Sequence, residues 1–214
     1  MSDTTAVSST GKRILNMTYI AMFAALMAVC AWIAVPIATI PITLQTFGVF
    51  CAVGLLGGKR GTLAILVYIL LGAIGVPVFA GFQAGVGVLF GATGGYIIGF
   101  VCTALVYWLI TGLLGKKWWT MLLGMVAGLF VCYAFGTAWF MVVYTQKAAI
   151  GLPAALGMCV IPYIIPDLVK IAAAMLLCQT VSRHVRIAFR PERAAFVRGG
   201  ICFIGLSFDD TRAG

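Results

Sequence analysis

The sequence predicts an all-α membrane protein with six transmembrane helices and with both its N- and C-termini in the cytoplasm. Of its 214 residues, 63% are hydrophobic and only 9% are charged, which is too little polar surface for a soluble domain. The apolar residues also form long runs, and about 20 apolar residues are what a helix needs to cross a bilayer.

Basic pairs, prolines and glycines divide the chain into six predicted helices. In chain order, these cover about residues 14–35, 44–57, 61–78, 91–115, 118–144 and 154–182. The second is short, and the sixth is expected to break near Pro162 and Pro166 because proline interrupts a helix. The predicted organisation is a cytoplasmic segment (1–13), a six-helix transmembrane domain (14–182) and a basic cytoplasmic tail (183–214).

Basic residues are distributed asymmetrically over the ends of these helices. One set of ends carries Lys12, Arg13, Lys59, Arg60, Lys116, Lys117, Arg183, Arg186 and Arg190, and the other carries Lys147. By the positive-inside rule the first set faces the cytoplasm, so the connections 36–43, 79–91 and 145–153 face outward. The net charge of +9 is thus explained by membrane topology, and no nucleic acid partner is expected.

The residue inventory excludes several kinds of chemistry. A Ser/His pair for nucleophilic catalysis is lacking, because the serines lie at or beyond the ends of the predicted spans and the single histidine, His184, lies at a cytoplasmic end. The seven cysteines have no metal-ligand spacing, and no GxxxxGK[ST] loop is present. We therefore predict a protein that is not an enzyme and has neither metal nor cofactor. Active transport would need an ion gradient or a separate ATPase.

Asp167 and Lys170 stand together inside an apolar run, in the stretch PYIIPDLVK. Three residues apart, they share one face of a helix. Charges within a membrane are costly and are functional candidates by default. We favour ligand recognition, with Asp167 accepting N–H groups and Lys170 donating to a carbonyl or pairing with a carboxylate. The alternatives are a purely structural pair and a proton relay, which would need a lone carboxylate with access to both sides.

Three further polar residues lie at the predicted outer ends of helices. Gln45 begins the second helix, Gln83 lies in a glycine-rich segment, and Tyr96 starts the fourth helix. Together with the acid–base pair they are candidates for a mostly apolar ligand pocket with a few fixed polar contacts. For Gln83 the alternative is a role in capping the loop.

Small residues recur every fourth position in the first predicted helix. Ala21 and Ala25 form one such pair, and Ala24 and Ala28 form another. This spacing lets a second helix approach closely. The alanines are therefore candidates for a partner interface, with internal packing as the alternative.

Three stretches, in this order, resemble the BioY family, the biotin-binding S components of energy-coupling factor (ECF) transporters. They are PITLQTFGV (41–49), GAIGVPVFAGFQAGVGVLFGATGGYIIGF (72–100) and IPDLVKIA (165–172). The resemblance covers about residues 12–185 and implies a six-helix S-component fold with an outer biotin site. The family's site residues fall on Gln45, Gln83, Tyr96, Asp167 and Lys170. Ala92 departs from the family, which often has proline there.

The resemblance also implies partners. The alanine face of the first helix would meet a membrane coupling protein (the T component) that carries two ABC-type ATPases, in the cell membrane of a prokaryote. We therefore predict high-affinity biotin binding and uptake, with the ureido ring of biotin at Asp167 and Lys170. The alternatives are a proton-coupled carrier for another small polar solute or vitamin, and an assembly protein without a substrate.

Overall fold

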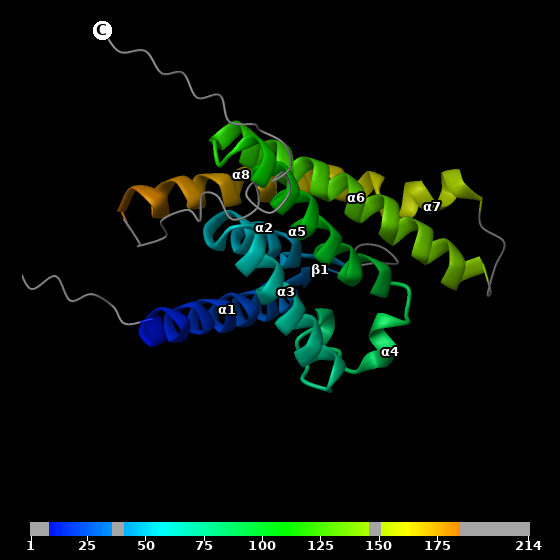
Figure 1. The fold of residues 1–214 in the computed structure, drawn as a ribbon. Coiled ribbons are helices and arrows are strands. Elements are labelled where there is room, and N and C mark those ends of the chain that lie inside the picture. Colours follow the sequence, from blue (N-terminus) through cyan, green and yellow to red (C-terminus); the bar gives the residue numbers. More distant parts are fainter. Residues whose placement is uncertain (1–8, 36–40, 146–150, 185–214) are drawn as a thin grey trace, which may run out of the picture.

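The computed structural model describes residues 9–35, 41–145 and 151–184. Its main elements are α1 (Ser9–Trp32), α2 (Gln45–Leu56), α3 (Gly58–Ala73), α4 (Val86–Leu89), α5 (Gly94–Leu114), α6 (Trp118–Thr145), α7 (Leu152–Cys159) and α8 (Ile161–His184), shown in Figure 1. The short strands β1 (Ala34–Val35) and β2 (Ile42–Thr43) pair antiparallel, and η1 (Ala80–Phe82) is a 3-10 helix. Most of the predicted tail, residues 185–214, and residues 1–8 of the predicted N-terminal segment lie outside the described residues.

Four stretches of these helices are long and apolar enough to cross a membrane. They are Arg13–Trp32, Gly94–Leu114, Trp118–Val143 and Pro153–Val181. The other two predicted spans correspond to the shorter helices α2 and α3, of 12 and 16 residues. The chain is therefore a mostly helical, multi-pass membrane protein, whereas six crossings stay a prediction.

Several helix boundaries differ from the predicted ones. α1 begins at Ser9 rather than at residue 14. α3 ends at Ala73 rather than at residue 78, because Gly75 takes a φ of 107° and Pro77 follows it. The last predicted helix is interrupted at Val160 and restarts at Ile161, next to Pro162 as predicted, whereas Pro166 lies inside α8 without a break. Pro162 is the second residue of α8, where the first N–H groups have no helical partner in any case.

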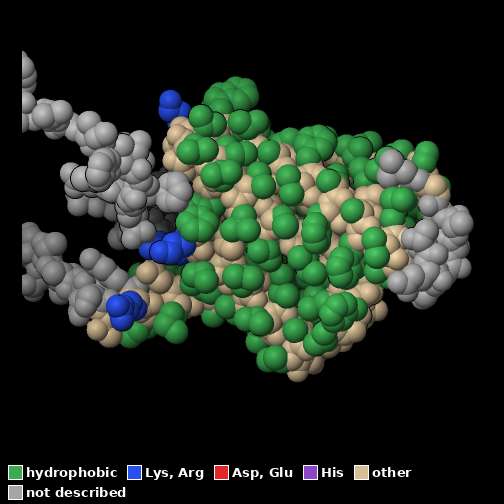
Figure 2. Space-filling view, turned by 45° about the vertical axis from the view of Figure 1, so that its right-hand side comes forward, with side chains coloured by type: hydrophobic (Ala, Val, Ile, Leu, Met, Phe, Trp, Pro, Cys, Tyr) green, Lys and Arg blue, Asp and Glu red, His purple; other side chains and the backbone are tan. Residues whose placement is uncertain are grey.

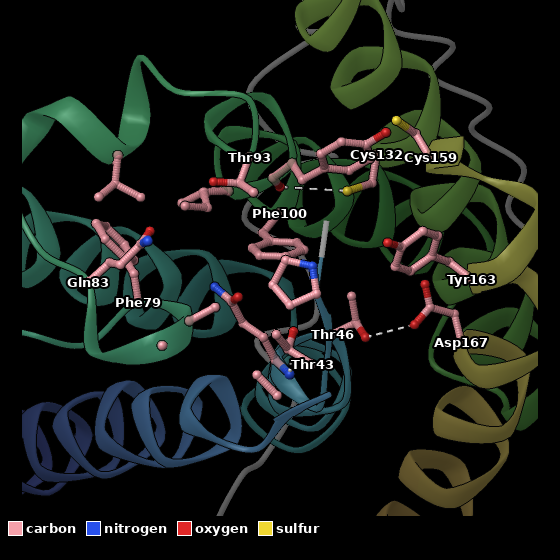
Figure 3. Close-up of a pocket in the computed structure, with 18 of the residues that line it drawn as sticks. Thr43, Thr46, Phe79, Gln83, Thr93, Phe100, Cys132, Cys159, Tyr163 and Asp167 are labelled. Atoms are coloured by element: carbon pink, nitrogen blue, oxygen red, sulfur yellow. Dashed lines mark hydrogen bonds between the residues drawn. The ribbon is translucent and has the colours of Figure 1, made fainter. Parts of the chain in front are cut away.

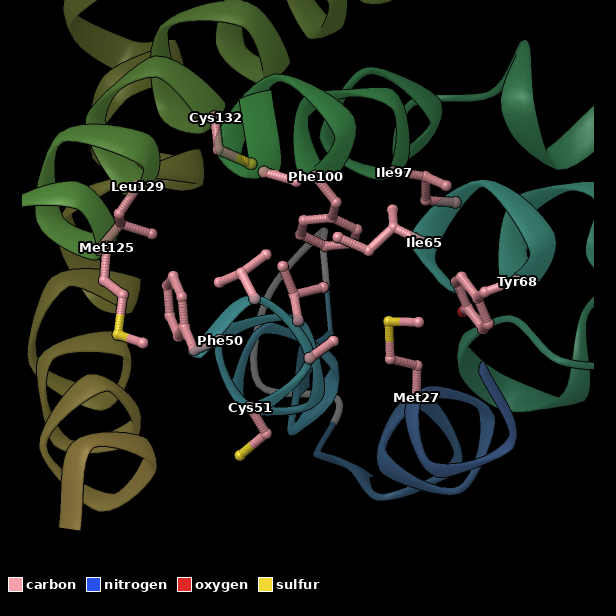
Figure 4. Packing of buried hydrophobic residues seen from close by; sticks show 14 of the residues in the cluster. Met27, Phe50, Cys51, Ile65, Tyr68, Ile97, Phe100, Met125, Leu129 and Cys132 are labelled. Carbon is pink, nitrogen blue, oxygen red and sulfur yellow. The ribbon is translucent and has the colours of Figure 1, made fainter. Parts of the chain in front are cut away.

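α2 lies at the centre of the bundle (Figure 4). None of its residues is exposed, because α1, α3, α5 and α8 pack around it. A helix that is hydrophobic on every side belongs in a core. Since protein rather than lipid covers α2, a length of 12 residues is sufficient.

Small residues line the contact between α5 and α6. They recur every fourth position and are Gly95, Gly99 and Thr103 on α5 and Gly124, Gly128, Cys132 and Gly136 on α6. A Cβ added at Gly128 would lie 2.7 Å from Cγ2 of Thr103, whose hydroxyl donates to the Gly128 carbonyl at 2.9 Å. The two helices therefore approach closely in the way small residues allow within membranes.

Apart from Lys170, the described basic side chains gather at one end of the bundle. At this end α1 begins, α2 meets α3, α5 meets α6, and α8 ends (Figure 1). Figure 2 shows Lys and Arg there and mostly hydrophobic side chains over the rest of the face. The basic residues whose side chains are described there are Arg13, Lys59, Arg60, Lys116 and Lys117. Lys147, Arg186 and Arg190 lie outside the described residues.

Candidate functional site

A cavity of about 490 Å³ is lined by residues from the end of α1 and the first turns of α2, α5 and α8. These helix ends lie opposite to the end that carries the cations (Figure 1). All five residues predicted to bind a ligand line the cavity: Gln45, Gln83, Tyr96, Asp167 and Lys170. Figure 3 shows Asp167 and Tyr163 on one side and Gln83 and Phe79 on the other. Most of the remaining wall is apolar, as in sites for small molecules that are oriented by a few polar contacts.

Asp167 and Lys170 form a buried ion pair in this wall. Nζ of Lys170 lies 2.8 Å from Oδ1 of Asp167, and the two residues are 8% and 3% exposed, respectively. They share one face of α8, as their spacing predicts. Asp167 lies in the second turn, however, because α8 already begins at Ile161. Pro166 therefore lies inside α8, and Asp167 is not at the positive end of this helix.

Three residues that were not predicted complete the bonding of this pair. Thr46 Oγ1 donates to Oδ1 of Asp167 at 2.9 Å, and the Tyr133 hydroxyl donates to Oδ2 at 2.6 Å. Lys170 also donates to the Thr43 carbonyl at 2.6 Å and to Thr46 Oγ1 at 3.1 Å. An ammonium has three donors, so all three of Lys170 are used within the protein. Oδ2 of Asp167 retains capacity to accept another hydrogen bond.

Gln45 is held in place by a hydrogen bond to α3. Its Nε2 donates to the Tyr68 hydroxyl at 2.8 Å, and that hydroxyl donates to the Val78 carbonyl at 2.9 Å. Gln45 is 5% exposed and Tyr68 is fully buried. The first residue of α2 is thus tied both to α3 and to the segment that precedes η1.

Gln83 and Tyr96 occupy other parts of the wall. Gln83 follows η1, and its side chain is exposed. Tyr96 lies in the first turn of α5, where its hydroxyl is 3.2 Å from Oγ1 of Thr137 on α6. The structure therefore brings Asp167 and Lys170 into direct contact and distributes the other predicted residues around the same cavity.

The end of α1 contacts the glycine-rich segment. Nε1 of Trp32 donates to the Pro77 carbonyl at 2.9 Å, and the Trp32 ring stacks on Phe82 with centroids 5.0 Å apart. Gly81 and Phe82 have φ values of 66° and 60°, in the left-handed region. This region disfavours residues with a side chain, so the stacking on Trp32 compensates for strain at Phe82.

α1 buries one of the two predicted alanine pairs. Ala24 and Ala28 are 2% and 6% exposed and belong to the core, whereas Ala21 and Ala25 are exposed. Ala24 and Ala28 are therefore packing residues within this chain. An interface with a partner stays a prediction for Ala21 and Ala25 alone.

Comparison with known proteins places the chain in a family. Residues 3–187 match the BioY family. The chain is 40% identical to a biotin transporter BioY of Thermotoga maritima, covering 73% of this chain and 89% of that protein. It is 39% identical to a probable biotin transporter BioY of Pyrococcus horikoshii, covering 77% and 94%, respectively. Its fold matches a crystal structure of the S-component for biotin from an ECF-type ABC transporter, with a TM-score of 0.74 and 24% identity over 82% of this chain and 95% of that chain. The chain belongs to the BioY family.

Proposed function

We propose that this protein binds biotin and acts as the substrate-specific component of an ECF-type transporter. The observation that carries the proposal is the buried Asp167–Lys170 pair in the wall of the cavity. Biotin has a ureido ring with two N–H donors and a carbonyl, an apolar thioether ring and a carboxylate tail. A mostly apolar cavity with polar groups at separate positions suits such a ligand, and relatives named as biotin transporters support the assignment.

In this proposal the ureido ring lies next to Asp167, and the carboxylate tail lies toward Gln83. Lys170 has no free donor for a carboxylate, because its three N–H groups are bonded within the protein. Asp167 would repel a second carboxylate, whereas its Oδ2 can accept an N–H group. Gln83 lies across the cavity from Asp167 and carries no charge (Figure 3).

The proposal also includes the setting of the protein. It would lie in the cell membrane of a prokaryote with both termini in the cytoplasm, since the described cations other than Lys170 gather at the end where α1 begins and α8 ends. The cavity then opens outward. A T component with two ABC-type ATPases would supply energy, and the exposed Ala21 and Ala25 are the surface of α1 proposed to meet it.

The test is equilibrium binding of labelled biotin to the purified protein in detergent, with Asp167→Asn and Lys117→Gln alongside. We expect one-to-one binding that Asp167→Asn weakens about 10- to 100-fold, because a hydrogen bond to a charged group is lost. Lys117 is exposed at the opposite end of the bundle, so Lys117→Gln is expected to leave the Kd for biotin unchanged.

Gel filtration and circular dichroism would establish that each variant is folded. Absence of biotin binding by the folded, unaltered protein would overturn the proposed ligand. A proton-coupled carrier for another solute would then be the function to examine.

A further inference from the structure

We propose that Tyr68 is a positioning residue that holds the Gln45 amide with its oxygen, Oε1, toward the ligand. Gln45 would then act as a hydrogen-bond acceptor that selects a ligand N–H group. Tyr68 is fully buried on α3 and acts through Gln45, which lines the cavity. This inference rests on the proposed function, in which a small polar ligand occupies that cavity.

The orientation of the amide follows from the Val78 carbonyl, which can only accept a hydrogen bond. The Tyr68 hydroxyl lies 2.9 Å from this oxygen and must donate its one proton to it. Toward Gln45, 2.8 Å away on its other side, the hydroxyl can then only accept. The amide atom facing Tyr68 is therefore the nitrogen, and Oε1 is the group left for the cavity.

Oε1 of Gln45 lacks a partner of its own. Among residues 9–35, 41–145 and 151–184, the hydrogen bonds of Gln45 run from its backbone N–H to Thr43 Oγ1 and from Nε2 to Tyr68. The residue is only 5% exposed and lines the cavity, so this oxygen is available to accept a hydrogen bond from a bound ligand. A ligand N–H would supply the missing hydrogen bond.

Tyr68 is well held for this role. Its ring packs edge-on against Phe79 with centroids 5.7 Å apart, and its hydroxyl bonds the segment before η1. The next residue after Gln45, Thr46, holds Asp167. The first turn of α2 thus places one acceptor, Gln45, and orients a second, Asp167. Two acceptors match a cyclic ligand group with two N–H donors, as in a ureido ring.

The experiment measures Kd for biotin and for the two biotin derivatives that carry a single N-methyl group on one or the other ureido nitrogen. In Tyr68→Phe the amide is free to turn, and biotin is expected to bind about 3- to 10-fold more weakly, as for the loss of one neutral hydrogen bond. One derivative carries its methyl group on the nitrogen whose N–H would bond to Gln45, so its Kd should be the same in Tyr68→Phe as in the unaltered protein. The ratio of its Kd to that of biotin should therefore fall about 3- to 10-fold in the variant. For the other derivative this ratio should be the same in both proteins.

Tyr107→Phe is the matched control. Tyr107 is also fully buried, but its hydroxyl has no hydrogen-bond partner in the described part of the chain. Its removal should leave every Kd unchanged. Gln45→Met provides a second variant that removes the acceptor while keeping Tyr68, and it should reproduce the fall in the same ratio.

Two results would overturn the role of Tyr68. One is equal weakening of all three ligands by Tyr68→Phe, which would indicate a merely structural residue, and the other is no effect on any of them. Failure of the proposed function is distinguishable, because the folded, unaltered protein would then not bind biotin at all.

Discussion

Each charge of the Asp167–Lys170 pair depends on the other for its neutralisation. Both residues are buried, and the other groups bonded to them are uncharged: the hydroxyls of Thr46 and Tyr133 and the Thr43 carbonyl. Truncating one partner of a buried pair leaves an uncompensated charge, which typically costs about 3–5 kcal/mol. Replacing both partners removes that penalty.

Lys170→Met is therefore expected to lower the free energy of unfolding by about 3–5 kcal/mol, and the double variant Asp167→Asn/Lys170→Met by clearly less. Thermal unfolding in detergent measures this, with Lys117→Met as an exposed control. If Lys170→Met were as stable as the unaltered protein, Asp167 would not need Lys170 to neutralise its charge. A folded double variant that no longer binds biotin would distinguish ligand recognition from a purely structural pair.

Charged and amide residues could be found from the sequence because they are rare and costly within apolar runs. Tyr133 and Thr46 could not, because hydroxyl residues occur throughout such helices. Their bonds to Asp167 span 34 and 121 positions in the chain. The contribution of Thr43 is a backbone carbonyl, which carries no mark in the sequence.

Among the elements, the α5–α6 pair depends on the absence of side chains at its contact. A Cβ at Gly128 would meet both Cγ2 of Thr103 at 2.7 Å and its backbone oxygen at 3.0 Å. Gly128→Ala is expected to destabilise the protein by about 1–3 kcal/mol, the usual effect of overpacking, as measured by thermal unfolding.

Gly112→Ala is the control on α5, because a Cβ at Gly112 would meet nothing within 4 Å. It should be neutral or slightly stabilising, since alanine favours helix more than glycine does. If Gly128→Ala proved as stable as Gly112→Ala, the close approach of α5 and α6 would not need glycine.

The long apolar helices were predictable, because length and hydropathy mark them, whereas the short helices η1 and α4 were not. The position of α2 was not, since an apolar helix looks the same in sequence whether lipid or protein surrounds it. The repeat of small residues on α5 and α6 was visible in the sequence and was overlooked. The pairing of β1 with β2 involves only two residues in each strand, too few for a periodic pattern.

For the whole molecule, the one-sided arrangement of the cations predicts orientation in the membrane. Alkaline phosphatase, which is active only after export, should be inactive when fused after Gly115, between α5 and α6. It should be active when fused after Thr145, at the other end of α6. Phosphatase activity is measured in cells that express each fusion. Activity after Gly115 and none after Thr145 would contradict cytoplasmic termini.

The central position of α2 has a consequence for biosynthesis. α2 is synthesised early, but it is buried on all sides only when α8, near the end of the described chain, packs against it. α8 also brings Asp167 and Lys170, which bond to Thr43 and Thr46 at the start of α2. The core around α2 and the polar wall of the cavity are therefore both completed only after α8 has been synthesised.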